Sequence, residues 1–228
     1  IKLLSEGSGG DEQAINRVTH YASTHNDFSN WCWNSLGANA FLAGRIDDAK
    51  EGLTKAYYQS QSSKDGICLL VTLACLGPTL IFSGETLKTL ELCDETEHWC
   101  KQHGYDALGA YSIVERVRVL AYRELNKLEQ AEHHCFLMNQ SFRHVDPLHK
   151  LYHTWAEVVL TLGREPERCL VLVNRLEKHF KSLYLKWHLG IPDPVLLTCI
   201  LDVQEGRVQG IVKWAKHFKK RLKSTASS

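Results

Sequence analysis

A short turn pattern recurs along this chain and limits what it can fold into. The turns begin near residues 44, 84, 126, 163 and 206, and each lies between two apolar segments of helical periodicity. They read GRIDDA, GETLKT, NKLEQA, GREPER and GRVQGI, with steps of 37 to 43 residues from one to the next. Self-similarity at a period of about 20 to 50 residues is typical of proteins that stack one small unit repeatedly.

The best-preserved unit, residues 33–56, predicts two short helices back to back. Apolar or small residues of its first half recur at i, i+3, i+4, i+7 and i+8, which is one face of a helix. Gly44 then ends that helix, because a residue without a Cβ adopts the left-handed conformation easily. Ala49, Leu53 and Ala56 give the second helix its own apolar face. Such a pair cannot bury both faces alone and needs neighbours on each side.

The other segments supply these neighbours. Residues 11–24 predict a second helix without its first, and the Gly77-Pro78 step predicts a kink or a break in an otherwise buried helix. The remaining helix pairs are expected at 67–84 with 84–104, 105–127 with 128–142, 147–163 with 164–180, and 192–206 with 207–223.

We therefore predict an all-α fold, a right-handed superhelix of about five helix pairs with a period of about 40 residues. Residues 11–223 are expected to form one solenoid domain. Residues 1–10 and 224–228 are expected to be disordered ends.

Composition narrows the classes of partner. Lys and Arg number 27 against 26 Asp and Glu, a net charge of +1, which argues against a dominant nucleic-acid-binding surface. No apolar run approaches the length of a membrane span, so we expect no membrane partner. The eight Cys lack the spacing of a disulfide framework, which indicates reduced thiols and a cytoplasmic protein. Because the chain begins with Ile1, we interpret it as a piece of a longer protein or a processed chain.

Residues 33–56 resemble a tetratricopeptide repeat. Ala40 stands where that motif usually has Tyr, and Gln61 where it usually has Pro. The period near 40 is longer than the 34 of that repeat, so longer helices are expected. The matching positions are Trp33, Leu36, Gly37, Gly44, Ala49, Leu53 and Ala56.

The chain also resembles a narrower family, the helical sensor region of MalT-like regulators, which are large ATP-binding transcription factors of the LuxR class. The resemblance is carried by LGANAFLAGRIDDA at 36–49, VLAYRELNKLEQAEHH at 119–134 and VLLTCILDVQEGRVQGIVKWAKHF at 195–218. It implies an effector-sensing superhelix, with an ATPase module before it and a DNA-binding helix-turn-helix after it. ATP would then be a cofactor of the missing N-terminal module only, DNA would contact the missing C-terminal module only, and self-association is a further expectation. No phosphate-binding G-x-x-x-x-G-K-[ST] occurs in the chain itself.

Ligands of a solenoid usually lie on the concave side, which is lined by the first helix of each unit. Aromatic, amide and charged groups together suit a sugar or a peptide. The plainer interpretation of the candidate residues is that they are ordinary packed or solvated side chains. The candidate residues are Trp31, Asn34, Phe41, Arg116, Arg123, Lys150, His153 and Glu157.

Enzymatic and metal chemistry receive no support from the motifs. No Gly-x-Ser-x-Gly occurs, and the spacing of Cys93, Cys100 and His103 departs from zinc-site patterns. We predict no catalytic residue, no metal and no enzyme activity.

The functional prediction is a sensing module of a MalT-like regulator that binds a small inducer or a protein partner in its concave groove. The alternative is a tetratricopeptide-like adaptor that holds a peptide segment of another protein.

Overall fold

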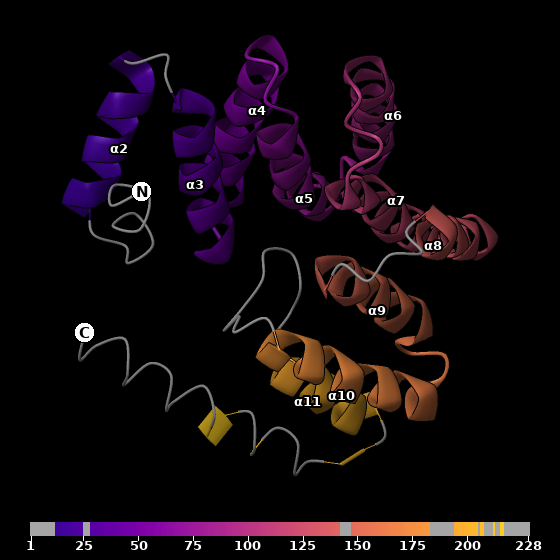
Figure 1. Ribbon diagram of the computed structural model, residues 1–228. Coiled ribbons are helices and arrows are strands. Elements are labelled where there is room, and N and C mark those ends of the chain that lie inside the picture. Colours follow the sequence, from indigo (N-terminus) through magenta and orange to yellow (C-terminus); the bar gives the residue numbers. More distant parts are fainter. Residues whose placement is uncertain are drawn as a thin grey trace. The chain divides into compact units, whose positions relative to one another are not determined.

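The computed structural model describes residues 12–24, 28–141, 147–182, 194–204, 206, 207, 212, 215 and 216 (Figure 1). Within these residues the regular structure is helical and no strand occurs, which confirms the all-α prediction. The chain divides into two compact units between Arg143 and His144, and each is described by itself. The expected disordered ends, 1–10 and 224–228, lie outside the described residues, and the single solenoid domain stays a prediction.

The first unit contains seven α-helices and one 3-10 turn among its described residues. Neighbouring helices pack on one another, and α3 also contacts α5, as α5 contacts α7. The elements are α2 (Glu12–Thr24), α3 (Ser29–Leu42), α4 (Ile46–Ser62), α5 (Gly66–Phe82), α6 (Thr86–His103), η2 (Gly109–Tyr111), α7 (Ser112–Glu124) and α8 (Leu128–Ser141).

In the second unit, α10 packs against both α9 and α11. The bounds are Pro147–Thr161 for α9, Pro166–Ser182 for α10 and Pro194–Gln204 for α11. The helix expected at 207–223 lies almost entirely outside the described residues.

The repeated turn of the sequence is a repeated backbone conformation. Each of the five aligned positions has a positive φ, of 56° to 81°. At four of them the next residue donates its N–H to the carbonyl five residues earlier, and the positive-φ residue donates to the carbonyl three residues earlier, which is the Schellman arrangement. The five residues are Gly44, Gly84, Asn126, Gly163 and Gly206; Gly163 is the exception in its hydrogen bonds.

Close packing in the opening helix pair depends on Gly37. A Cβ built on Gly37 would lie 2.6 Å from Leu53 Cγ and 2.8 Å from the Leu53 backbone nitrogen. Ala49, Leu53 and Ala56 on α4 are fully buried. The small residues of α3 therefore let the backbone of α4 approach closely, as the sequence predicts.

Two segments differ from expectation. Helix α5 continues from Gly66 to Phe82 with Pro78 inside it, so of the two predicted alternatives the break is wrong and the kink stays a prediction. The segment 105–127 becomes helical only at residue 109, because Tyr105 is held elsewhere: its hydroxyl donates to the carbonyl of Lys64 at 3.1 Å, and its ring fills the space beside Gly66.

Candidate functional site

The predicted groove residues occupy equivalent positions on the first helices of the first unit. Stepping by 40 and then 42 residues relates Trp31 to Val71 and Ile113, Asn34 to Ala74 and Arg116, and Phe41 to Ile81 and Arg123. We call these three sets the Trp31, Asn34 and Phe41 positions. Because α3 contacts α5 and α5 contacts α7, each set runs across three packed helices.

The Asn34 position joins neighbouring helices instead of facing outward. The Asn34 side chain, 4% exposed, donates to Thr72 Oγ1 of α5 at 2.8 Å. Arg116 has no exposed surface, and its Nη2 donates to the carbonyl of Ala74, also on α5, at 3.0 Å. This corrects the expectation that Asn34 and Arg116 line an open groove. A buried polar group needs a partner, and both find one in the adjacent helix.

The Gly77-Pro78 step explains why an arginine occupies position 116. Proline has no N–H, so the carbonyl four residues earlier, that of Ala74, loses its helical donor. Arg116 supplies the missing hydrogen bond. Gly77 permits the approach of α7, since a Cβ there would lie 2.5 Å from Val117 Cγ1.

The Trp31 position has one polar anchor and a half-buried ring. The indole N–H of Trp31 donates to Asp65 Oδ2 at 2.7 Å. The other carboxylate oxygen of Asp65 accepts from the backbone N–H of Cys68 at 3.0 Å and so caps α5. Trp31 and Val71 are both half-buried, which leaves part of each side chain open to a ligand.

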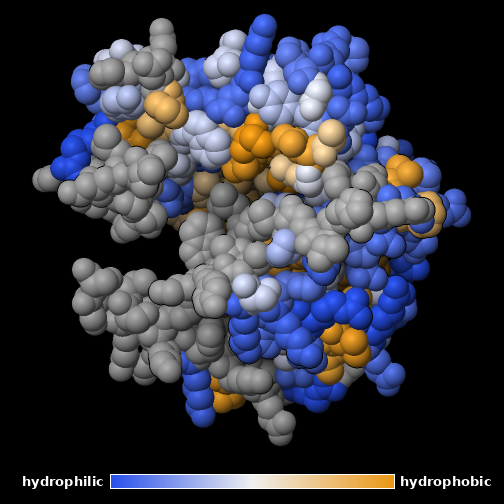
Figure 2. Space-filling view, viewed as in Figure 1, coloured by the Kyte–Doolittle hydropathy of each residue, from blue (hydrophilic) through white to orange (hydrophobic). Residues whose placement is uncertain are grey.

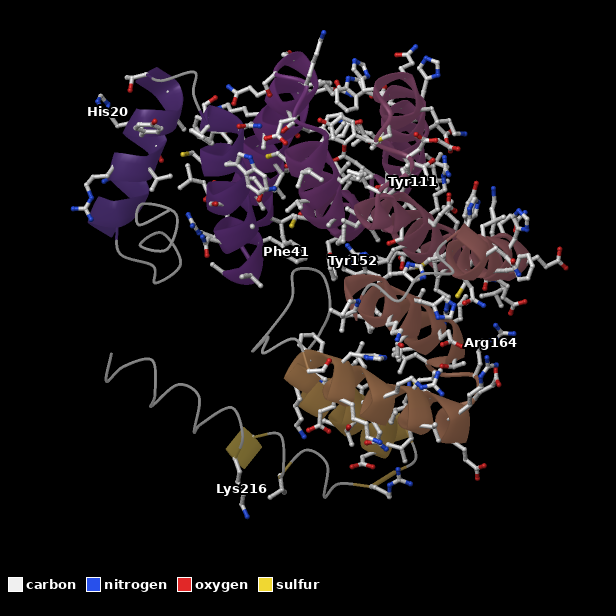
Figure 3. The ribbon with its side chains drawn as sticks, viewed as in Figure 1. His20, Phe41, Tyr111, Tyr152, Arg164 and Lys216 are labelled. Carbon is white, nitrogen blue, oxygen red and sulfur yellow. The ribbon has the colours of Figure 1, made fainter. Side chains whose placement is uncertain are left out.

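An apolar cluster lies at the C-terminal ends of α3 and α5. The rings of Phe41 and Phe82 have centroids 5.9 Å apart, and Phe82 is 74% exposed. Leu42 is 52% exposed beside them in the sequence. Figure 3 shows Phe41 at the end of α3. Arg123, the α7 member of this position, is half-buried. Phe41 and Arg123 stay predicted ligand residues.

Hydrophobic surface also gathers over α5. Figure 2 shows orange atoms on the visible face in the region of α5, surrounded by hydrophilic atoms. On this helix Ile67 is 40% exposed and Val71 is half-buried, whereas residues 72–80 are all buried. Only the two ends of α5 are therefore available to a partner.

Sequence reasoning did not predict the buried charge network between α6, α7 and α8. Arg118 of α7 donates to Asp94 Oδ1 at 2.7 Å, to Glu115 Oε1 at 3.0 Å and to Glu97. Glu115 also contacts His134 Nδ1 of α8 at 2.6 Å. Every carboxylate in the network has a cationic or imidazole partner. We therefore interpret the network as an electrostatic connection between three helices. Its only sequence signal is Arg118 within the mostly apolar run IVERVRV at 113–119.

Tyr111 lies beside this network, where α6 and α7 meet (Figure 3). Burial raises the pKa of its hydroxyl, and the carboxylates of Glu97 and Glu115 raise it further. The phenol therefore stays protonated at neutral pH and can donate a hydrogen bond.

In the second unit the predicted residues fall in one row. Lys150, His153 and Glu157 lie at i, i+3 and i+7 of α9, on one face of the helix. His153 Nδ1 is 3.5 Å from Glu157 Oε2. Lys150 is exposed and the other two are half-buried. The structure thus brings these three candidates together, and we call them the α9 row.

A second row, which the sequence reasoning missed, faces the α9 row from α10. Its members are Arg168, Arg175 and His179, at i, i+7 and i+11. Glu157 lies 3.8 Å from Arg168 Nη2 and 3.9 Å from Arg175 Nη1. Their spacing of 7 and 11 residues places them on one face of a helix, and this is the signal that could have identified the α10 row.

Burial makes several of the thiols poor nucleophiles. All eight Cys are free and buried. Burial raises the pKa of Cys68 to about 11 and the pKa of Cys75 and Cys100 to about 12. A thiol with so high a pKa holds almost no thiolate at neutral pH and reacts slowly.

The described residues contain neither a candidate metal site nor a candidate membrane span. No group of three or more His, Cys, Asp or Glu there could hold a metal ion. No helix in the part of the chain that the structure describes is long and apolar enough to cross a membrane.

Comparison with known proteins does not assign the chain to a family. No family model matches it, and no curated protein matches it.

Proposed function

We propose that the chain is a tetratricopeptide-like solenoid of about five helix pairs that binds a small effector or a protein segment along its first helices. We further propose that it serves a MalT-like regulator of the LuxR class as the sensing region. ATP and DNA would then be bound by other modules of that regulator, and the sensing region would control their self-association.

The observation that carries the proposal is the recurrence of one helix-ending turn. A positive-φ residue stands at 44, 84, 126 and 163 between two described helices of 13 to 18 residues, and another stands at 206 after α11. The contacts of α3 with α5 and of α5 with α7 support stacking of successive first helices. Repeat proteins of this kind recognise partners through the surface that such stacked helices share.

The mechanism we infer uses the polar bridges between first helices. Asn34 joins α3 to Thr72, and Arg116 joins α7 to Ala74. A ligand that touches two neighbouring first helices would favour one spacing of these bridges over another. Differential affinity for two curvatures would shift their populations, and this is the thermodynamic requirement for a sensor.

One observation favours the adaptor alternative. The exposed apolar cluster of Phe41, Leu42 and Phe82 suits an apolar side chain of a peptide better than a sugar. In that case peptides would bind and sugars would not. The full-length gene would also lack a Walker motif upstream and a helix-turn-helix downstream.

The experiment is a thermal-unfolding titration of the purified chain against separate panels of saccharides, small metabolites and peptides. A ligand that binds only the folded state raises Tm with its concentration. Val71→Arg places a long charged side chain on the wall of α5, and Tyr58→Arg is the control on the exposed surface of α4, where Tyr58 is 51% exposed. We expect Val71→Arg to abolish the Tm shift and Tyr58→Arg to keep it. If no compound of any panel shifts Tm, the sensing function is wrong.

A further inference from the structure

The α9 and α10 rows have opposite electrostatic character at their two ends. The four residues 162–165 join the packed helices, so α9 and α10 run antiparallel, and the start of α9 lies beside the end of α10. Near the connecting turn, Arg168 is neutralised by Glu165 at 3.2 Å and Glu157 at 3.8 Å. Glu157 and Glu165 thus place negative charge toward the turn.

The other end is basic. It holds Lys150 and His153 of α9 with Arg175 and His179 of α10. Within 147–182 and 194–204, no carboxylate lies within 4 Å of the Lys150 ammonium, and the only one near Arg175 is Glu157 at 3.9 Å. That distance is too long for a hydrogen bond, so the donors of Arg175 are not consumed by Glu157.

Both imidazoles at this end, those of His153 and His179, lie in a positive electrostatic environment. Burial lowers the pKa of His179, and the charges of Arg175 and Lys150 lower it further. Burial also lowers the pKa of His153, where Arg175 adds to the effect and Glu157 opposes it. Arg175 acts on both rings, and Lys150 acts on His179 alone. Glu157 lies near both Arg168 and Arg175, so in the antiparallel pair His153 is level with Arg175, and Lys150 is level with His179.

We propose that Lys150, Arg175, His153 and His179 form a binding site for the phosphoryl group of a small phosphate ester. A phosphoryl dianion matches the two cations in charge. Arg175 offers a planar pair of N–H donors, Lys150 offers a point charge, and a neutral imidazole offers one N–H. The inference rests on the proposed function, because it names the chemical class of a ligand that the chain senses.

The test is an NMR titration of the full chain with inorganic phosphate, glucose 6-phosphate and glucose, at constant ionic strength held with chloride. Constant ionic strength matters because exposed charges are screened by salt. We expect both phosphates to shift the resonances of His153 and His179, and glucose to leave them unchanged. His20, exposed on α2, is the reference ring. Tighter binding of glucose 6-phosphate than of inorganic phosphate indicates an ester ligand, and equal binding indicates that the phosphoryl group alone is read.

Matched variants locate the site. Lys150→Gln and Arg175→Gln should each weaken phosphate binding by up to about fivefold, the effect of losing one exposed ion pair, and the double variant by about tenfold or more. Lys181→Gln is the control, since Lys181 lies two residues after His179 on α10, on the opposite side of the helix, and its side chain is 73% exposed. Glu157→Gln should tighten binding, because Glu157 is the one carboxylate within 4 Å of Arg175 among the described residues. Circular dichroism checks that each variant is folded.

Two outcomes would overturn the inference: phosphate shifts no larger than those of chloride, or phosphate affinity unchanged in the double variant. Either one leaves the proposed function standing if another ligand still raises Tm in a manner that Val71→Arg abolishes. Conversely, phosphate binding at α9 and α10 with no ligand whose Tm shift Val71→Arg abolishes would contradict the proposed function alone.

Discussion

Single residues in this chain have roles that follow from what their atoms meet. Gly37 is defined by contact, because any Cβ there would collide with the backbone of α4, 2.8 Å away. Gly44 is defined by conformation, because its φ is +73° and nothing lies within 4 Å of a Cβ built on it. The sequence already predicts the helix-ending role of Gly44, and the structure adds the contacts that exclude a Cβ at Gly37.

The two glycines predict two different losses of stability. Gly37→Ala should lower the free energy of unfolding by about 2–3 kcal/mol, because the backbone of α4 must move to relieve the overlap. Gly44→Ala should cost about 1 kcal/mol, the usual penalty of the left-handed conformation with a Cβ. Urea denaturation of both variants measures the difference. A loss in Gly37→Ala no larger than in Gly44→Ala would contradict the close packing of α3 on α4.

Glu97 predicts a pH dependence of stability. Burial would raise the pKa of Glu97, but hydrogen bonds from Lys101 and Arg118 outweigh burial and lower the pKa from 4.5 to about 2. A folded pKa below the unfolded one stabilises the protein above pH 4.5, and this contribution is lost as the pH falls from 4.5 toward 2.

Urea denaturation of Glu97→Gln between pH 7 and pH 3 tests this dependence. The variant should be less stable than the wild type at pH 7, and the gap should narrow below pH 4.5. Glu91→Gln is the control, since Glu91 is exposed on the same helix. A gap that stays constant over the whole range would show that Glu97 is not ionised in a stabilising pair.

At the scale of helices, the sequence predicts where most elements lie but not how they are joined. Periodicity and turn glycines place α2 to α6 and α8 to α11 within a few residues, because these signals are local. The bridges Asn34–Thr72 and Arg116–Ala74 cross 38 and 42 residues of sequence. Such contacts depend on which helix becomes the neighbour, so a polar residue on a first helix was interpreted as a groove residue.

The candidate site residues are likewise only partly predictable from the sequence. The α9 row was predicted, because its three residues share one helix face. The α10 row was missed, because its relevance depends on the antiparallel packing of α10 against α9. The start of α7 was also misplaced, since Tyr105 binds the turn at Lys64, 41 residues earlier.

We predict that Pro78 of α5 and Arg116 of α7 are coupled in their effects on the free energy of unfolding. Arg116→Met should cost about 3 kcal/mol, because it leaves the buried carbonyl of Ala74 without a donor. Pro78→Ala restores the helical N–H to that carbonyl. In the Pro78→Ala background, Arg116→Met should therefore cost about 1 kcal/mol less.

A double-mutant cycle from chemical denaturation measures this coupling. The matched cycle pairs Arg116→Met with Ser62→Ala, an exposed position on α4, and should be additive. A coupling of zero between Pro78 and Arg116 would mean that Arg116 does not replace the hydrogen bond that proline removes.

At the level of the whole molecule, the proposed solenoid depends on the stacking of successive helix pairs. In a stacked repeat each unit contacts only its neighbours, so stability is close to a sum of local terms. Every helix from α3 to α8 contributes buried residues within the first unit, and the chain divides after Arg143. Cutting the chain at the boundary between two pairs should then leave the preceding pairs intact.

The most direct measurement is amide hydrogen exchange of residues 1–143 expressed alone, compared with the same residues in the full chain. We predict that α3 to α7 keep their protected amides in the fragment. Loss of protection throughout α3 to α7 would show that these helices need residues 144–228 to fold. That result would contradict a structure built by stacking helix pairs.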